Sequence, residues 1–233
     1  LTAAGQDVFD TARDLEDIVL GLERRVHGRD ARLAGPVRVT LPDPLLAPLL
    51  PLFRQFTRAH PDIALTLAID TGYADLAHRE ADIAIRAAAE PPSELVGRRI
   101  ATIGVGVYGS REYLKGRPPR DLSSLDWIGW EQGSAMTFAR WIHENVPGER
   151  IALRVNHGWA LRDAIDEGFG VSLLPCAAGD KMRTWQRVRR EPALTAPLWV
   201  LTHKDLRTTA RVRVLRDFLS DSISAERKTY EGK

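Results

Sequence analysis

PVRVTLPDPLLAPLLPLFRQFTRAHPDIALTLAI, residues 36–69, decides the fold of this chain. Residues 37–41 and 63–69 each alternate apolar with other side chains, which is the period of a strand. Between them, apolar residues recur at helical spacing, and the helix should end near His60 because Pro61 disfavours helical geometry in the residue before it. Two strands joined through a helix predict a parallel βαβ unit, whose ligands bind at the carboxyl ends of the strands.

Composition indicates an ordinary globular protein. The chain has 233 residues, 44% hydrophobic and 27% charged, which suits one large domain or two small ones. The net charge of +2 is too small to predict that this chain as a whole binds nucleic acid. No apolar run approaches the roughly 18 residues of a membrane span, and the acidic N-terminus is not a signal peptide. Cys176 is the only cysteine, which fits a cytoplasmic location.

Residues 1–27 are expected to form one long amphipathic helix. Apolar residues recur at the alternating four-three spacing of a coiled coil. The predicted oligomerisation seam is Leu1, Val8, Ala12, Leu15, Val19, Leu22 and Val26. Packing on the chain's own domain is the alternative, but the narrow, sustained stripe favours pairing between subunits, as a homodimer or homotetramer. The abrupt start without a methionine suggests that an upstream part is missing.

Nine segments, taken in order, carry a family signature. They are LTxAG, GxVRV, LLPLFRxFxxxHPDIxLxL, xEADIAIR, ELVGRRI, YGSREYL, DLSSLDWI, LRDAIDEGFGVSLLP and VRVLRDFL. The chain resembles the LysR-type transcriptional regulators from residue 1 to about residue 223. The resemblance implies a linker helix that follows a missing N-terminal winged helix-turn-helix domain, through which the parent protein would bind DNA.

The same resemblance implies the domain organisation. An α/β, two-lobed, periplasmic-binding-protein-like domain with two crossing strands should follow the long N-terminal linker helix. The expected parts are 1–33 as linker helix and linker, 34–104 plus 198–223 as lobe I, 105–197 as lobe II, and 224–233 as a flexible tail. A small-molecule effector would lie between the lobes.

Three segments should converge on this cleft. They are residues 42–44, residues 133–136 and residues 156–158. They precede helices, whose first N–H groups can hold an anion. Ser134 and Asn156 are explained equally well as helix caps. The candidate effector-binding residues are Pro42, Asp43, Pro44, Thr71, Arg86, Ser134, Met136, Asn156, His157 and Gly158.

Asp43 is unusual, because LysR-like proteins often carry a hydroxyl residue in this loop to help bind a carboxylate. Its own carboxylate would repel an anion unless a positive group offsets it. One interpretation is a helix cap, favoured there by the macrodipole. The sharper hypothesis is a ligand with a cationic group, such as an amino acid, whose carboxylate is held by Arg86.

Other patterns do not favour catalysis. Gly104, Gly106 and Gly109 match a dinucleotide fingerprint, but they lie within a predicted strand rather than in a turn after it. The basic run from Lys181 to Arg190 is more typical of a solvated face than of a DNA contact. Cys176 is expected to be a small buried hydrophobe, although a redox role stays open. The histidines show no metal-ligand spacing, so we expect no cofactor, no metal and no enzyme. A solute-binding protein for transport is the alternative function, ahead of a small α/β enzyme.

Overall fold

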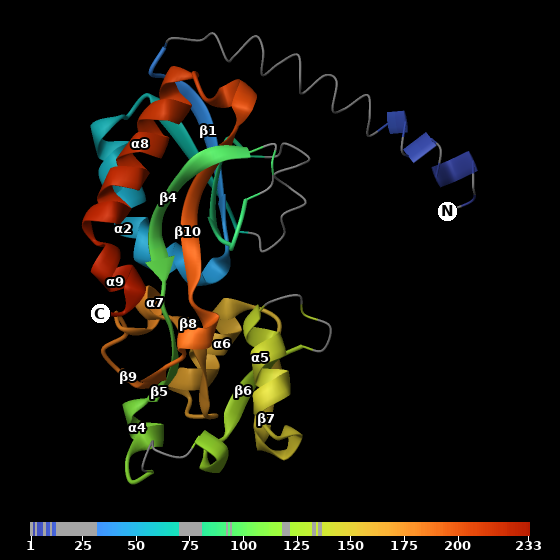
Figure 1. The fold of residues 1–233 in the computed structure, drawn as a ribbon, viewed down its shortest axis with the longest axis vertical. Helices are drawn as coiled ribbons and strands as arrows, with labels where there is room; N and C mark the ends of the chain where they lie inside the picture. The colour runs from blue at the N-terminus through green and yellow to red at the C-terminus, as the bar shows by residue number, and fades with distance from the viewer. Residues whose placement is uncertain are drawn as a thin grey trace.

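The computed structural model describes residues 2, 4–6, 8–9, 11–12, 32–69, 81–91, 93, 95–117, 122–131, 134 and 137–233. From residue 32 onward they form two α/β lobes, one above the other, each built on a five-stranded sheet (Figure 1). The predicted two-lobed α/β fold is therefore confirmed. None of the described helices is long and apolar enough to cross a membrane.

The predicted oligomerisation seam is described only in small part. Val8 and Ala12 are helical and exposed, with 69% of Val8 accessible. Leu1, Leu15, Val19, Leu22 and Val26 lie outside the described residues. The pairing of subunits through this helix stays a prediction.

Lobe I contains a mixed sheet. Its strands, in order across the sheet, are β2 (Ile63–Ile69), β1 (Gly35–Leu41), β3 (Ile83–Ala87), β10 (Ala196–His203) and β4 (Leu95–Ile103). β1 is parallel to β2 and β3, whereas β10 is antiparallel to both its neighbours. The parallel β1–β2 pair confirms the βαβ unit.

Helix α2 (Asp43–Ala59) makes the crossover between β1 and β2. Its apolar stripe is buried against the sheet, through Leu45, Leu49, Leu52, Phe53 and Phe56. The helix ends where Pro61 predicts, because His60 is the C-cap residue and its N–H donates to the Phe56 carbonyl.

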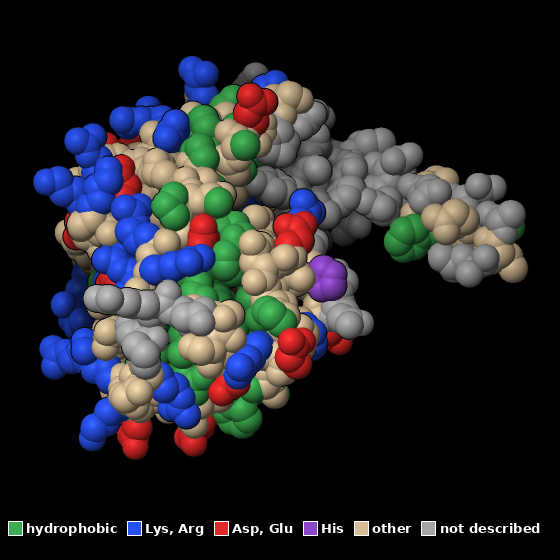
Figure 2. Space-filling model, turned by 60° about the horizontal axis from the view of Figure 1, so that its bottom comes forward, with side chains coloured by type: hydrophobic (Ala, Val, Ile, Leu, Met, Phe, Trp, Pro, Cys, Tyr) green, Lys and Arg blue, Asp and Glu red, His purple; other side chains and the backbone are tan. Residues whose placement is uncertain are grey.

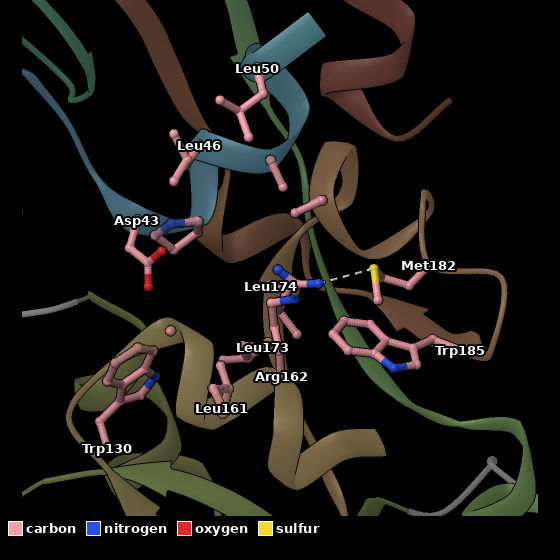
Figure 3. Close-up of a pocket in the computed structure, with 14 residues that line it drawn as sticks. Asp43, Leu46, Leu50, Trp130, Leu161, Arg162, Leu173, Leu174, Met182 and Trp185 are labelled. Carbon is pink, nitrogen blue, oxygen red and sulfur yellow. Dashed lines mark hydrogen bonds between the residues drawn. The ribbon is translucent and has the colours of Figure 1, made fainter. Parts of the chain in front are cut away.

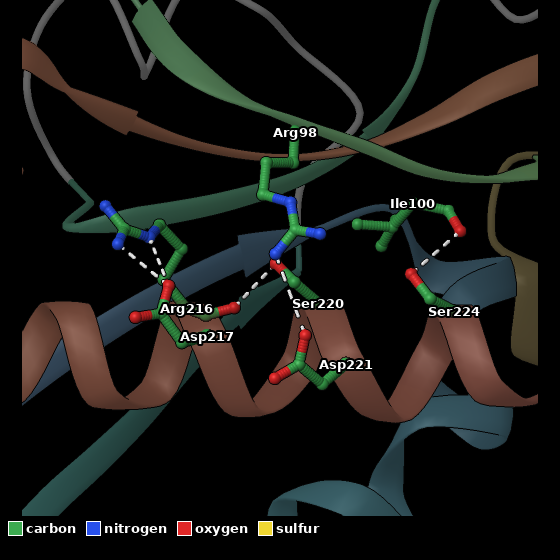
Figure 4. Close-up of polar contacts among 7 residues, drawn as sticks. All are labelled: Arg98, Ile100, Arg216, Asp217, Ser220, Asp221 and Ser224. Atoms are coloured by element: carbon green, nitrogen blue, oxygen red, sulfur yellow. Dashed lines mark hydrogen bonds and ion pairs between the residues drawn. The ribbon is translucent and has the colours of Figure 1, made fainter.

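Helix α8 (Ala210–Ala225) packs on lobe I beside β4 (Figure 1). Leu215, Leu219 and Ile223 on its inner face are fully buried. Figure 4 shows the Ser224 hydroxyl, which donates to the Ile100 carbonyl at 3.2 Å and ties the helix to β4. The Arg98–Asp221 ion pair in the same view is well exposed, so it contributes little stability.

Lobe II contains the second mixed sheet. Its strands, in order, are β7 (Ile151–Val155), β6 (Trp127–Trp130), β8 (Val171–Pro175), β5 (Val105–Ser110) and β9 (Trp185–Arg190). β6 is parallel to β7 and β8, so their carboxyl ends lie at one edge of the sheet. The helices of this lobe are α4 (Arg111–Leu114), α5 (Thr137–Asn145), α6 (Gly158–Asp166) and α7 (Cys176–Gly179).

The chain passes between the sheets twice, from β4 to β5 at Gly104 and from β9 to β10 through a 3-10 turn at Pro192–Leu194. Helix α9 (Arg227–Glu231) lies beside the first crossing. The Gly104 N–H donates to the Tyr230 carbonyl at 2.8 Å, and the Tyr230 side chain is 2% exposed. This differs from the flexible tail that the polar sequence predicts, because one buried aromatic ring and these backbone contacts order the segment.

The basic run of lobe II is only partly a solvated face. Lys and Arg side chains gather toward one side of the molecule's lower face (Figure 2). Arg189 is half exposed, as predicted. Arg187 and Arg190 instead donate to the carbonyls of Gly232 at 3.0 Å and Glu231 at 2.7 Å. These guanidinium groups therefore fasten the C-terminal segment to β9.

Candidate functional site

The segment after β1 places its three predicted residues at the junction of the lobes. Pro42 is the N-cap residue of α2, and Asp43 is already the first helical residue. The loop between β1 and α2 is therefore shorter than predicted, because the fixed φ of proline suits the first turn of a helix as well as a loop. The N-cap residue, Pro42, makes no side-chain capping hydrogen bond, so Asp43 does not cap α2, although it does lie in the first turn, where the helix dipole favours an acidic residue.

A cavity of about 290 Å³ lies on the hinge side of the α2 N-terminus, and we call it the hinge cavity. Pro42, Pro44 and Arg86 from lobe I line it, together with residues of both crossings, among them Ile103, Val105 and Leu194. Thr137 and Phe138, at the start of α5, close it from lobe II. Two candidate regions, the segment after β1 and the end of β3, thus meet the α5 N-terminus here.

Arg86 is the charged residue among the described residues that line the hinge cavity. It lies near the end of β3 and is 3% exposed. Its guanidinium donates to the Thr40 hydroxyl at 3.0 Å and to the Ile85 carbonyl at 3.1 Å. A buried guanidinium that borders a cavity is suited to bidentate binding of a carboxylate, because its five donors form a rigid fork.

A second cavity, of about 110 Å³, lies on the other side of the α2 N-terminus, and we call it the α2–α6 cavity (Figure 3). Its walls are mostly apolar: Leu46 and Leu50 come from α2, and Leu161, Met182 and Trp185 come from lobe II. Figure 3 shows the Asp43 side chain directed from α2 toward α6. A β-carbon at Gly158, the first residue of α6, would overlap the Asp43 carboxylate.

The predicted site residues are therefore divided between two cavities. Pro44 lines both, Pro42 and Arg86 line the hinge cavity, and Asp43 and Gly158 line the α2–α6 cavity. Asp43 and Arg86 do not share one cavity, which argues against one small ligand held by both.

Three of the remaining candidates, Ser134, Asn156 and His157, are not among the described residues that line either cavity. Asn156 and His157 are exposed, and the His157 ring stacks on Trp159 with centroids 6.1 Å apart. Thr71 and Met136 fall outside the described residues. Asn156 and His157 thus mark the approach to α6 rather than a cavity wall.

Sequence reasoning missed Trp130 and Thr137. Trp130 ends β6, and Thr137 begins α5, so both lie at the carboxyl edge of the lobe II sheet. The rule that singled out Pro42–Pro44 would have found Trp130 had it been applied to this strand. Its place in an apolar run, WIGW, carries no local signal that separates a cavity residue from a core residue.

Cys176 lies in a polar cluster behind the crossing strands. It is fully buried, and its Sγ is 3.4 Å from the Arg187 guanidinium, which also pairs with Asp180 at 3.4 Å. The Tyr108 hydroxyl donates to Asp180 at 2.8 Å, and burial raises the pKa of this phenol far above its ordinary value. The cluster therefore joins β5, α7 and β9 as a structural unit.

The dinucleotide-like glycines serve packing. Gly106 and Gly109 lie within β5, as predicted, and Gly104 lies just before it. A β-carbon at Gly104 would meet the Glu231 backbone, so this glycine allows α9 to approach the crossing. No group of three metal-ligating side chains occurs within the described part of the chain.

Comparison with known proteins places these features in a family. The sequence model of the LysR substrate binding domain matches residues 30–224. An HTH-type transcriptional repressor of Pseudomonas aeruginosa (strain UCBPP-PA14) is 28% identical over 187 residues, which cover 77% of this chain and 56% of that protein. The chain spans little more than half the length of this relative. The HTH-type transcriptional regulator CrgA of Neisseria meningitidis is 26% identical, over 96% of this chain and 79% of the relative.

Solved structures show the same fold. The regulatory domain of CrgA from Neisseria meningitidis superimposes with a TM-score of 0.68 at 24% identity, over 81% of this chain and 98% of that one. Full-length AphB from Vibrio cholerae gives 0.64 at 20% identity, over 94% of this chain and 79% of that one. At these identities the structures support the fold alone. The family match over residues 30–224 shows that this chain belongs to the LysR substrate binding domain family.

Proposed function

We propose that the chain is the effector-sensing part of a DNA-binding transcriptional regulator, and that a small molecule binds in its hinge cavity. The matched relatives are transcriptional regulators, which supports this function over transport by a solute-binding protein. DNA would be bound by an N-terminal helix-turn-helix domain, and subunits would pair through the helix that contains Val8 and Ala12. Such a protein acts in the cytoplasm and needs no catalytic set.

One observation carries the choice of the hinge cavity: a buried guanidinium, that of Arg86, borders it beside both crossings. A ligand there touches both lobes and the segments that join them. It can bind one arrangement of the lobes more tightly than another, and this differential affinity would shift the equilibrium between them. Arg86 favours an effector with a carboxylate group.

Calorimetry on a panel of small carboxylates tests this proposal. Thermal-shift screening selects the ligands, since binding to the folded protein raises its apparent stability. Arg86→Lys keeps the charge but removes the bidentate fork, so we expect affinity to fall at least about ten-fold. Arg99→Lys, at an exposed position on β4, is the matched control and should bind as the wild type does.

Two results would contradict the proposal. One is that no carboxylate of the panel binds. The other is that a selected carboxylate binds wild type and Arg86→Lys equally, provided that circular dichroism shows both to be folded.

A further inference from the structure

The C-terminal helix α9 lies at the level where the two lobes meet (Figure 1). On the lobe I side it packs against β4 and α8, and on the lobe II side it packs against α7. Arg187 and Arg190 of β9 hold it from lobe II, through the carbonyls of Gly232 and Glu231. One short segment therefore contacts both lobes at once.

The first crossing is held between α9 and α7. The Gly104 N–H donates to the Tyr230 carbonyl at 2.8 Å, and the Gly104 carbonyl accepts from the Cys176 N–H at 2.8 Å. The Val105 carbonyl accepts from the Glu191 N–H, also at 2.8 Å, which joins the first crossing to the second. Rotation of one lobe relative to the other changes the backbone torsions of the segments that join them. These hydrogen bonds oppose such a change while α9 is docked.

The lobe II side of this contact is a firm platform. Arg187 pairs with Asp180 at 3.4 Å, and Asp180 accepts from the Tyr108 hydroxyl at 2.8 Å. Gly232 lies directly over the fully buried Cys176, because a β-carbon at Gly232 would overlap the Cys176 Sγ. Gly232 also has a φ of +71°, which favours glycine. A larger residue at this position would both strain the backbone and displace the segment.

Few interactions hold α9 itself. It has five residues, far fewer than the roughly 12–15 that an isolated helix needs in water. Tyr230 supplies its buried side chain, while residues 227–229 are exposed. The docked state also leaves the buried Arg190 Nε without a partner among the described residues, which is unfavourable. Segments with few buried contacts open at a smaller free energy than the whole fold.

We propose that α9 is a releasable clasp on the first crossing. When docked, it holds the two lobes in the arrangement described above. When undocked, it frees the crossing segments to move and uncovers Cys176. An effector in the hinge cavity contacts Ile103 and Val105 beside the same crossing, so it favours the docked state in which this cavity is formed. This last coupling rests on the proposed function, whereas the release of α9 does not.

Cys176 reports on the clasp directly, because it is the only cysteine of the sequence and is buried under Gly232. Alkylation by iodoacetamide, followed by mass spectrometry, measures how often its thiol is uncovered. In the wild-type protein the alkylation rate should be almost independent of urea at low concentrations, because local opening exposes little surface. A rate that rises with urea as steeply as global unfolding does would overturn the proposal.

Gly232→Ala opens the clasp without removing any core side chain. The added β-carbon cannot lie against Cys176 in the docked state, so alkylation should be at least about ten-fold faster. Gly116→Ala is the matched control, because Gly116 has a similar φ of +75° but nothing within 4 Å of an added β-carbon. It should be alkylated at the wild-type rate. Equal rates for Gly232→Ala and Gly116→Ala, with both shown to be folded by circular dichroism, would contradict the clasp.

A ligand arm separates this proposal from the proposed function. A carboxylate that binds the hinge cavity should slow the alkylation of wild-type Cys176 several-fold, because it stabilises the docked state. A bound carboxylate that leaves this rate unchanged would overturn the coupling and leave the cavity assignment standing. If no carboxylate binds, the proposed function fails, and the rates of the ligand-free variants still decide whether α9 is released.

Discussion

The two cavities beside the α2 N-terminus differ in how they are built. Chain segments that run from one lobe to the other line the hinge cavity, at Ile103, Val105 and Leu194. Side chains that meet across the lobes form the α2–α6 cavity, and neither crossing contributes to it. A change in lobe arrangement should therefore alter the α2–α6 cavity more than the hinge cavity. The α2–α6 cavity is expected to be conditional on closure of the lobes, and the hinge cavity is expected to be largely preformed.

The cavities also differ in charge. A buried cation, Arg86, borders the hinge cavity, whereas an anion, Asp43, enters the α2–α6 cavity. Both of these charges belong to lobe I, and lobe II adds the Arg162 guanidinium to the wall of the α2–α6 cavity. Lobe II also supplies hydrogen-bond donors from the backbone. These donors are neutral, but they favour anionic ligand groups.

The largest expected effect on stability comes from removing the buried Tyr230 ring, which lies beside the first crossing, a segment that lines the hinge cavity. Tyr230→Ala deletes a buried ring beside the Gly104 crossing, and we expect the free energy of unfolding to fall by about 3–5 kcal/mol. Chemical denaturation measures this loss. Hydrogen exchange should show reduced protection of the Gly104 amide. Tyr230→Phe retains the ring and should stay near wild type; a similar small effect of Tyr230→Ala would mean that α9 does not support the crossing.

The next largest effect on stability concerns the contact between the lobes at the α2–α6 cavity. Gly158→Ala places a β-carbon on the Asp43 carboxylate, and overpacking of this kind should destabilise the protein by about 1–3 kcal/mol. Asp43→Ala should relieve most of this, so a double-mutant cycle should give a coupling energy above about 0.5 kcal/mol. Additive effects would show that the lobes do not meet at these residues in solution.

Sequence reasoning located the framework better than the cavities. The βαβ unit follows from alternation, helical spacing and Pro61, which are local signals, and α2 ends where they predict. Asp43 was recognised as unusual, but its contact with Gly158 joins residues 115 positions apart and leaves no local pattern. Asp43 and Arg86 lie on opposite sides of the α2 N-terminus and so line different cavities, a tertiary relation that strand and helix periodicity does not encode.

For the C-terminal segment, the sequence predicted flexibility where the structure has an ordered helix. Its polar composition indicated a flexible tail, yet Tyr230 is buried and Arg190 donates to the Glu231 carbonyl. Those arginines, in turn, were expected to face solvent. Each prediction was reasonable alone. The hydrogen bonds of Arg187 and Arg190 to the C-terminal segment contradict the predicted tail and, for these two arginines only, the predicted solvated face.

A pH titration tests the strand that backs the hinge cavity. Tyr108 on β5 is buried, which raises its pKa above the ordinary value of about 10. The folded protein therefore holds this proton more tightly than the unfolded chain. The resulting stability is fully present below pH 10 and is lost as the pH rises above it, by up to about 1.4 kcal/mol per pH unit for one group.

Tyr108→Phe should flatten this loss between about pH 10 and 11.5 in denaturation measured at several pH values. Tyr230 and Tyr113 also have raised pKa values, so a residual slope is expected in the variant. An unchanged slope would show that Tyr108 is not buried as a neutral phenol in the folded protein.

The smallest expected effect distinguishes two tryptophans of one strand. Trp127 Nε1 donates to the Leu122 carbonyl at 3.1 Å, whereas Trp130 Nε1 has no partner among the described residues. Trp127→Phe should lower the free energy of unfolding by at least about 1 kcal/mol, because it leaves a carbonyl unpaired. Trp130→Phe removes an unpaired donor, so its lost packing is offset and stability should change by less than about 1 kcal/mol. Equal losses in the two variants would mean that the Trp130 indole already has an acceptor in the folded protein.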